Sequence, residues 1–445
     1  MSKIILDRKI SLLQATAINM TDMVGIGPFI VLSVVVEKMN GPWFLYAWIA
    51  GAFLSFIDAM IWSELGATFP LAGGSYNFLK EGFGPKWGKL MSFLFVWQTM
   101  IQAPLVIASA AIGFAQYFTY ILPLDEIQRK LVSGSVVILI VLLLYRKIET
   151  IGKISVFLWL GVLITMACII FGGFYHGQFL EPVKHINDGL EVNSAFAAAL
   201  GFASVKTMYS YLGYYNVCHL GGEIINPEKN IPKSMFISVA GIALLYLFMN
   251  ISVASVLPLE TIIKSPFVVS DYVQALAGPI AATIVTALVL WVAFASVFSA
   301  TLGYSRIPYA AAKDGAFFSI FAKLHPTKHF PYISLLFLGS VAFVFSLLFR
   351  ISDVISAILA MRILIQFVGQ GIGLLLLSKQ KRRNFFKWKM PLFPIPVIVA
   401  MVLWICIFYS TTFDMIRLAL FIISLGIIAF MVKARYNKEW PFQQV

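Results

Sequence analysis

The sequence predicts an all-α integral membrane protein of about twelve transmembrane helices. Hydrophobic residues make up 60% of the 445 positions and charged residues only 12%, against about 45–50% and about 25% in soluble domains. Apolar stretches of about 18–25 residues recur along the chain, each long enough to cross the roughly 30 Å hydrocarbon core of a bilayer. They lie at residues 11–36, 42–66, 88–121, 131–145, 152–174, 193–219, 236–257, 280–312, 332–349, 353–378, 393–413 and 416–433.

The N-terminal stretch and the cysteines exclude several other classes of protein. The first stretch contains Asp22 and has no small-residue cleavage site, so we expect it to remain as a spanning helix and not to be removed as a signal peptide. The three cysteines show no CxxC spacing and the five histidines are dispersed, so we expect no metal and no cofactor. The loop Pro123–Lys130 holds no cysteine. We therefore expect no disulfide-linked ancillary subunit at that loop.

The distribution of charge predicts the topology. A net charge of +13 would suggest a nucleic-acid partner in a soluble protein, but here most of the 33 Lys and Arg residues fall in the even-numbered connections and the two tails. Cytoplasmic loops keep such an excess. We therefore predict a multi-pass protein of the cell (plasma or inner) membrane with cytoplasmic termini and no nucleic-acid partner. The cluster Lys379–Lys389 fits this topology signal or, alternatively, a lipid-binding patch.

The first stretch is interrupted in its middle. Gly25, Gly27 and Pro28 break an apolar run, and proline fits best at the first position of a helix because it lacks an N–H. We therefore predict one half-helix ending near Val24 and a second starting at Pro28. The free N–H groups of the break would then form an anion site at a helix N-terminus. Alternatively, the glycines only allow close helix packing and the proline makes a simple kink.

The sixth stretch is interrupted as well, by Gly213 within an aromatic and polar run. Interrupted segments at corresponding positions are typical of a secondary transporter built of two inverted repeats of five helices. This pattern predicts one transmembrane domain, with repeats at about 11–174 and 193–378 and two extra helices at about 393–433. An unwound stretch from each repeat would frame one central pocket.

Four motifs resemble one known family. Gly221–Lys233 reads GGEIINPEKNIPK and resembles the hallmark after the sixth helix of the amino acid, polyamine and organocation (APC) transporter superfamily. Three further segments, Val24–Phe29, Phe69–Tyr76 and Ser305–Gly315, are similar to the family's motifs at the first, second and eighth helices. The resemblance implies the leucine-transporter-like fold of 5+5 inverted repeats plus two helices, with helices 1 and 6 unwound. It also implies alternating access and an amino acid or amine substrate.

The resemblance also implies residue roles. The N–H groups of Ile26 and Gly27 would bind the substrate carboxylate, although Ile26 replaces a small polar residue common in the family. The carbonyls of Met23, Tyr209 and Leu212 would bind the amine, and the Tyr209 ring would close over the substrate. Gln102 lies one turn after Gln98 on the third helix, so it either lines the pocket or joins helices. The expected substrate-binding set is Met23, Gly25, Ile26, Gly27, Tyr209, Leu212, Gly213 and Gln102.

Ionisable residues at membrane depth are costly and are therefore candidates for gating or coupling. We hypothesise that Asp22 pairs with Lys206 and either exchanges a proton or contacts a substrate amine; alternatively, Lys206 extends to the membrane surface. Arg362 either contributes to an outer gate or satisfies backbone carbonyls. Trp159 occupies the place where many relatives have a lysine. Coupling to H+ or to Na+ therefore stays open.

Other functions fit the sequence less well. A polyamine or organic cation transporter would need carboxylates beyond Asp22, and the sixth helix offers Lys206 instead, which favours an amino acid. A membrane enzyme would need a convergent acid–base pair, a metal-spaced set or a nucleophile, and the sequence shows none. A sensor that binds without transporting would use the same pocket. A channel is disfavoured because the breaks build a closed central site.

Overall fold

The computed structural model describes residues 6–39, 41–175, 178–348 and 351–442, with the backbone alone at 351–356. The longer helices are α1 (Leu12–Met23), α2 (Gly27–Met39), α3 (Phe44–Thr68), α5 (Gly84–Ile121), α6 (Glu126–Leu144), α7 (Ile148–Tyr175), α9 (Ser194–Tyr211), α11 (Pro227–Ala254), α13 (Val268–Tyr304), α15 (Tyr332–Leu348), α16 (Ile351–Arg362), α17 (Gly369–Gln380), α18 (Ile395–Tyr409) and α19 (Phe413–Tyr436). Shorter elements are α4 (Ser75–Gly82), α8 (Glu181–Lys184), α10 (Asn216–His219), α12 (Leu259–Lys264), α14 (Arg306–Lys313), a π-helix at Ile363–Val368 and 3-10 turns at Gly221–Glu223, Ser319–Ala322 and Arg383–Phe385.

The predicted all-helical membrane fold is confirmed. Among the described residues, eight helices are long and apolar enough to cross a membrane, or nine if the bent pair α1–α2 counts as one span. Two further apolar helices, α15 and α18, are shorter. Each predicted stretch has a helical counterpart, although the ninth ends at residue 349, outside the described part. That the chain has twelve transmembrane helices, and that they form two repeats, stay predictions.

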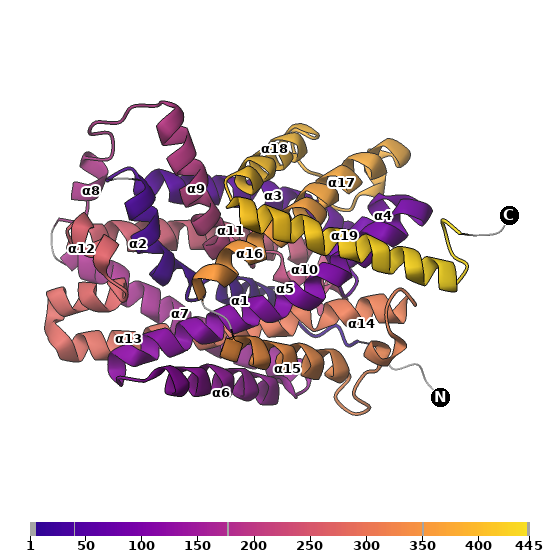
Figure 1. The fold of residues 1–445 in the computed structure, drawn as a ribbon, viewed down its shortest axis with the longest axis horizontal. Helices are drawn as coiled ribbons and strands as arrows, with labels where there is room; N and C mark the ends of the chain where they lie inside the picture. The colour runs from indigo at the N-terminus through magenta and orange to yellow at the C-terminus, as the bar shows by residue number, and fades with distance from the viewer. Residues whose placement is uncertain (1–5, 40, 176–177, 349–350, 443–445) are drawn as a thin grey trace.

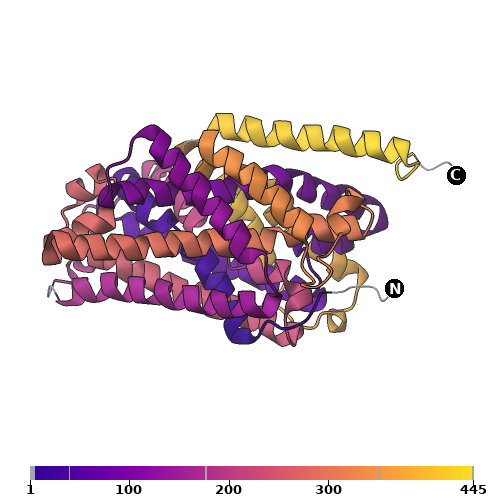
Figure 2. The ribbon, with the colours of Figure 1, turned by 90° about the horizontal axis from the view of Figure 1, so that it is seen from below.

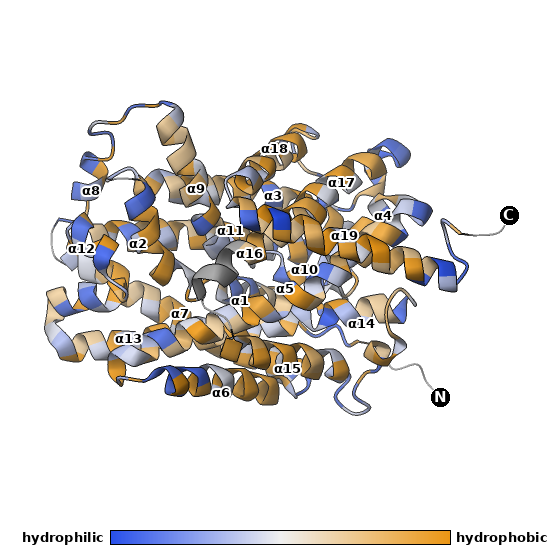
Figure 3. Ribbon diagram, viewed as in Figure 1, coloured by the Kyte–Doolittle hydropathy of each residue, from blue (hydrophilic) through white to orange (hydrophobic). Residues whose placement is uncertain are grey.

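The long helices run along one axis of the molecule, and the broken segments lie inside the bundle. Helices α5, α7 and α13 extend along this axis, whereas α1 and α10 lie near the centre (Figure 1). The chain enters and leaves the described structure at the same end of the axis in both views (Figures 1 and 2). Helices α15 and α19 are hydrophobic along their middle, and hydrophilic residues gather at the ends of α6 and α19 (Figure 3). This pattern suits a bilayer around the middle.

The eighth predicted helix, 280–312, differs from the observed one. Helix α13 ends at Tyr304, and Arg306 begins the separate helix α14. Arg306 Nε and Nη2 donate to the two carboxylate oxygens of Glu223, each at 2.9 Å, and both side chains are almost fully buried. The ion pair fixes the start of α14 against the turn at Glu223. Apolar periodicity could not show this, because the partner comes from 83 residues earlier.

The same turn ties down the N-terminal segment. The N–H groups of Lys9 and Ile10 both donate to the carbonyl of Glu223 at 2.9 Å, and Ile225 donates back to Ile10 at 2.9 Å. Gly73, in the loop after α3, donates to the carbonyl of His219 at 2.9 Å. Four segments distant in sequence are therefore interlocked at the end of the bundle where the chain begins.

Candidate functional site

The first predicted span is two helices separated by a short non-helical link. Helix α1 ends at Met23 and α2 begins at Gly27, with a bend of 44° between them. Pro28 is the second residue of α2, where its missing N–H costs nothing. The N–H groups in the first turn of a helix have no partner within that helix. The start of α2 therefore presents free donors inside the bundle.

The sixth predicted span is broken next to the first. Helix α9 ends at Tyr211 and α10 begins at Asn216, after a turn that includes Gly213. Gly213 has φ +123°, and a Cβ there would lie 2.8 Å from the backbone nitrogen of Met23. Only glycine combines this backbone conformation with so close an approach. The two breaks are therefore in direct contact.

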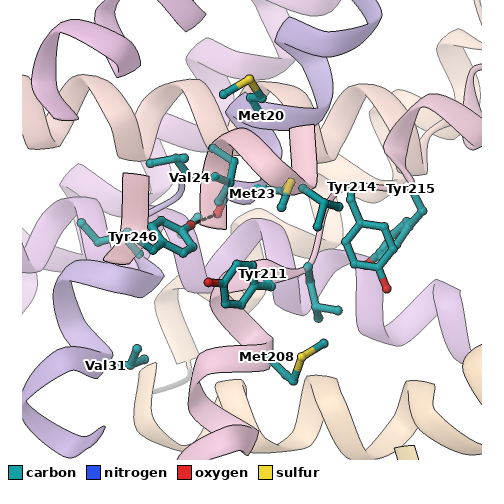
Figure 4. Close-up of a cluster of buried hydrophobic side chains, with 14 of the residues drawn as sticks. Met20, Met23, Val24, Val31, Met208, Tyr211, Tyr214, Tyr215 and Tyr246 are labelled. Carbon is teal, nitrogen blue, oxygen red and sulfur yellow. Dashed lines mark hydrogen bonds between the residues drawn. The ribbon is translucent and has the colours of Figure 1, made fainter. Parts of the chain in front are cut away.

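A buried tyrosine of α11 joins both breaks. The Tyr246 hydroxyl lies 2.7 Å from the carbonyl oxygen of Met23 and 3.0 Å from that of Ser210, so its single proton is shared between the last turns of α1 and α9. The Met23 carbonyl also accepts from the N–H of Gly25 at 3.0 Å. Figure 4 shows the Tyr246 hydroxyl pointing towards Met23, with the Tyr211 ring beside that of Tyr246. This contact satisfies backbone groups that the breaks leave without helical partners.

Helix α13 and α1 brace the second break from the other side. Asn19 accepts a hydrogen bond from the N–H of Val217 at 2.9 Å, near the start of α10. Asn216 donates to the carbonyl of Ser299 at 2.8 Å, and Ser299 donates to the carbonyl of Ile18 at 2.7 Å. Asn19 thus gives the start of α10 an acceptor that the interrupted helix lacks, and Asn216 and Ser299 link that start to α1.

The two breaks enclose a small cavity. Its volume is about 40 Å3, which holds a few water molecules but no amino acid. It contacts nine of the expected residues: Asp22, Met23, Gly25, Ile26, Gly27, Tyr209, Leu212, Gly213 and Arg362. It also contacts Val106, Ala110, Ser210, Tyr215, Ser296, Tyr304 and Ile358. Its wall is therefore mostly apolar, with one acidic and one basic side chain.

Tyr209 covers one side of this cavity. Its hydroxyl lies 2.9 Å from the hydroxyl of Ser109 on α5. This contact connects the end of α9 to α5. A Cβ on Gly27 would lie 3.1 Å from the Tyr209 ring. The ring therefore sits directly over the start of α2, where the free N–H groups lie.

The acidic and basic groups of the cavity act on each other. Asp22 and Arg362 both line the cavity, and Arg362 is the charged group that acts electrostatically on the Asp22 carboxylate. Lys206 is not among the groups that act on Asp22, so the expected Asp22–Lys206 pair is not formed here. Arg362 lines the same cavity from the end of α16, whereas Lys206 does not line it.

Arg362 is held by aromatic rings. Its guanidinium centre lies 4.9 Å from the ring centroid of Tyr215 and 5.7 Å from that of Tyr304, and its Nε donates to Gln366 at 2.8 Å. Its Nη2 is buried and has no hydrogen-bond partner among the described residues. The π-helix Ile363–Val368 follows directly; such local widening recurs at functional sites.

Three expected residues lie away from the cavity. Gln102 is buried on α5, Trp159 lies on α7 and the partly buried Lys206 lies on α9, and none of them contacts the cavity. Gln102 is buried and Trp159 partly buried, and both roles considered for Gln102 stay predictions. The spacing of residues along a helix shows on which side of that helix each side chain lies. It does not show whether that side faces the cavity.

Sequence reasoning missed several residues of the site. Tyr246, Tyr304 and Ser296 gave no local signal, because a tyrosine or serine in an apolar helix usually reports only packing. Asp58 of α3 is also buried, with its carboxylate accepting from Trp62 at 2.8 Å, from Trp404 at 3.1 Å and from Tyr214. The sequence places Asp58 among the ionisable residues at membrane depth but does not show its partners. Asp58 holds Tyr214, which lies within the second break.

Among the described residues, no cluster of His, Cys, Asp and Glu could hold a metal ion. The cavity offers backbone groups, hydroxyls, one acidic side chain and one basic side chain. Such a site can bind a small zwitterion: N–H groups at a helix start suit an anion, and carbonyls at a helix end suit an ammonium group.

Known proteins resemble this chain over most of its length. A model of the family "Amino acid permease" matches residues 10–433. The serine/threonine exchanger SteT of Bacillus subtilis is 25% identical over 399 residues, 89% of each chain. The human cystine/glutamate transporter is 25% identical over 399 residues, 88% of this chain and 78% of the relative. The human large neutral amino acids transporter small subunit 2 is 26% identical over 344 residues, 75% of this chain and 63% of the relative.

These relatives are transporters or exchangers of amino acids and not enzymes. The family match covers nearly the whole chain, including both breaks and all four motifs. The protein is thus a multi-pass membrane transporter with a small-molecule amino acid as its substrate, and the predicted resemblance is confirmed. The chain belongs to the amino acid permease family of the APC superfamily.

Proposed function

We propose that the protein is a secondary active transporter that moves a neutral α-amino acid by alternating access, with the substrate held at the two helix breaks. The observation that carries this proposal is the cavity formed where Gly213 lies against Met23, with free donors at the start of α2 and the Tyr209 ring above them. The names of the relatives agree with an amino acid, two of them naming neutral ones.

The substrate carboxylate is assigned to the N–H groups of Ile26 and Gly27, at the positive end of the α2 dipole. The amine is assigned to the carbonyls of Tyr209 and Leu212, at the end of α9. Met23 is the weakest of the expected acceptors, because its carbonyl already accepts from Gly25 and Tyr246. A carbonyl oxygen has two lone pairs, and both are used.

A neutral side chain fits the charges of the cavity. Asp22 and Arg362 interact with each other, so the wall presents no excess charge for an acidic or cationic side chain. The remaining wall near the start of α2 is apolar, with Ile26, Val106 and Ile358. A polyamine finds only Asp22 for its several ammonium groups. A neutral amino acid is therefore favoured over the polyamine alternative.

Transport requires the cavity to expand and to open towards each side in turn. Tyr209, held by Ser109, is assigned as the lid on one side. The Glu223–Arg306 pair and the segments tied to it are assigned as the gate on the other side, which we take as cytoplasmic because the basic loops and both tails lie there. Asp22 and Arg362 are assigned to coupling, and the choice between H+, Na+ and exchange is left to transport assays.

The first test is a ligand screen by thermal unfolding of the purified protein. A ligand that binds the folded state at a hundredfold excess over its Kd adds about 2.7 kcal/mol of stability. We expect stabilisation by one class of neutral L-amino acid, and none by the matching amine without a carboxylate. Uptake of that amino acid into proteoliposomes then separates a transporter from a sensor. Stabilisation by polyamines alone, or binding without uptake, would overturn the proposal.

A further inference from the structure

A basic groove lies far from the two breaks, where helix α11 begins. It has a volume of about 410 Å3 and lies between the first turns of α11 and the linker that joins α17 to α18. The residues that line it are Glu228, Lys229, Pro232, Lys233, Phe236, Ile237, Lys387 and Trp388. Nothing in the proposed transport cycle uses this groove.

The groove carries excess positive charge. Lys229 and Lys233 are exposed and lie one turn apart on α11, and Lys387 faces them from the linker. The acidic residue that lines the groove is Glu228, 3.8 Å from Lys387, with both side chains more than half exposed. An ion pair of that length and exposure is weak. Three lysines therefore face one carboxylate, which leaves the groove suited to an anion.

The linker that carries Lys387 is fixed and not a loose surface loop. Arg383 binds the carboxylate of Glu64, which is fully buried at the end of α3, and the N–H of Met390 donates to the same carboxylate at 2.8 Å. The N–H of Lys387 lies 3.4 Å from the hydroxyl oxygen of Thr68. Because both flanks are anchored to α3, Lys387 is held in place over α11. A preorganised site loses less entropy on binding.

An apolar, outward-facing stripe continues from the groove along α11. Ile237, Leu244 and Phe248 are 50%, 55% and 40% exposed, and their spacing of seven and four residues places them on one helix face. In a membrane protein such a face contacts acyl chains. The neighbouring helix α3 adds Phe53 and Phe56, 55% and 40% exposed. The stripe begins where the lysines end.

Aromatic side chains mark the level between the two zones. The Phe236 ring packs on Trp388 and on Phe56, with centroid distances of 5.4 and 5.3 Å. Tryptophan is enriched at the boundary between headgroups and hydrocarbon. The lysines, the aromatic rings and the apolar stripe thus follow one another along α11. This is the order of the headgroup, the interfacial region and the acyl chains of a phospholipid in a bilayer.

We propose that this groove binds an anionic phospholipid, with its phosphate among Lys229, Lys233 and Lys387 and its acyl chains along Ile237, Leu244 and Phe248. A basic pocket at the membrane surface next to lipid-facing helices is a recognised way to hold such headgroups. The site depends only on the chain lying in a bilayer. It is therefore independent of the transport proposal above.

The test uses the full chain, delipidated in a mild detergent and titrated with phosphatidylglycerol or phosphatidylcholine, with binding followed by native mass spectrometry and thermal unfolding. We expect phosphatidylglycerol to bind and stabilise, and phosphatidylcholine to do so far less. In the variant K229Q/K233Q/K387Q, we expect the affinity for phosphatidylglycerol to fall by about a hundredfold, since each lysine near a membrane surface contributes about a factor of five.

The matched control is K86Q/K323Q/K379Q, which removes three exposed lysines outside the groove and should bind phosphatidylglycerol like the unmodified chain. The unfolding temperature without lipid checks that both triple variants fold, and the single variant K233Q provides a milder perturbation. Four results would overturn the proposal: equal binding of phosphatidylcholine, equal losses in control and groove variants, displacement of the lipid by inorganic phosphate, or a dimer that only the groove variant loses.

Discussion

The Tyr246 hydroxyl lies 2.7 Å from the Met23 carbonyl and 3.0 Å from the Ser210 carbonyl, so a single phenol proton links the ends of the two broken helices. Tyr246 itself is fully buried on α11. The breaks are therefore held at a fixed separation by a side chain from a third helix. That separation sets the size of the cavity between them.

Removing this hydroxyl should loosen the site without creating a void. We expect Y246F to lose about 0.5–1.5 kcal/mol of stability, the usual net value of one hydrogen bond, and to weaken substrate binding. Thermal unfolding and a binding titration measure the two effects. The control is Y436F, at an 88% exposed position, which should change neither. Substrate affinity unchanged in Y246F would remove Tyr246 from the site.

Gly213 tests the contact between the breaks. We expect G213A to abolish uptake, because the new Cβ would lie 2.8 Å from Met23 N as well as straining a backbone with φ +123°. Gly41 has φ +133° and open space around its Cβ position, so G41A carries the strain, about 1–2 kcal/mol, without the clash. Proteoliposome uptake compares them. Equal uptake by both variants would show that the close contact is unimportant.

Tyr209 tests the lid. Y209F keeps the ring over the start of α2 but loses the 2.9 Å contact to the Ser109 hydroxyl, so we expect slower transport at nearly unchanged affinity. Y209A removes the ring, and we expect at least about a tenfold loss of affinity, the equivalent of one to two buried apolar contacts. Binding and uptake should be measured together. If Y209A binds substrate as tightly as the unmodified chain, Tyr209 is not the lid.

Asp22 tests the charge pair of the cavity. D22N leaves Arg362 without its acidic neighbour, so we expect slower uptake with a flatter pH dependence. Restoring neutrality in D22N/R362Q should recover part of the loss, because the two groups act on each other. D125N is the control: Asp125 caps α6, and asparagine caps equally well. Uptake and its pH profile unchanged in D22N would exclude a coupling role.

Glu223 and Arg306 test the opposite gate. E223Q leaves a buried arginine without its partner, which typically costs about 3–5 kcal/mol. We expect E223Q to unfold at a much lower temperature and to transport substrate at a changed rate. The double variant E223R/R306E, which restores the opposite charges, should partly reverse both effects. E149Q breaks the exposed pair with Lys9, whose side chains are 57% and 52% exposed, and should change little. Equal effects of E223Q and E149Q would contradict a gating role for the buried pair.

The sequence by itself determined the class of this protein. Long apolar stretches dictate membrane helices, because no soluble surface can be built from them. The first break is also predicted by local residues, since Gly25, Gly27 and Pro28 each disfavour a continuous helix. Four motifs in order identified the family. Each of these features is a property of a stretch of sequence no longer than about one helix, so it can be recognised without knowing the tertiary structure.

Only the tertiary structure decided which groups meet at the site. Asp22 interacts with Arg362 and not with Lys206, Gln102 and Trp159 lie outside the cavity, and Tyr246 joins the breaks. The physical reason is that periodicity fixes a residue's direction only relative to its own helix. The rotation and depth of each helix in the bundle come from packing against neighbours far away in sequence, and so do the contacts that close the cavity.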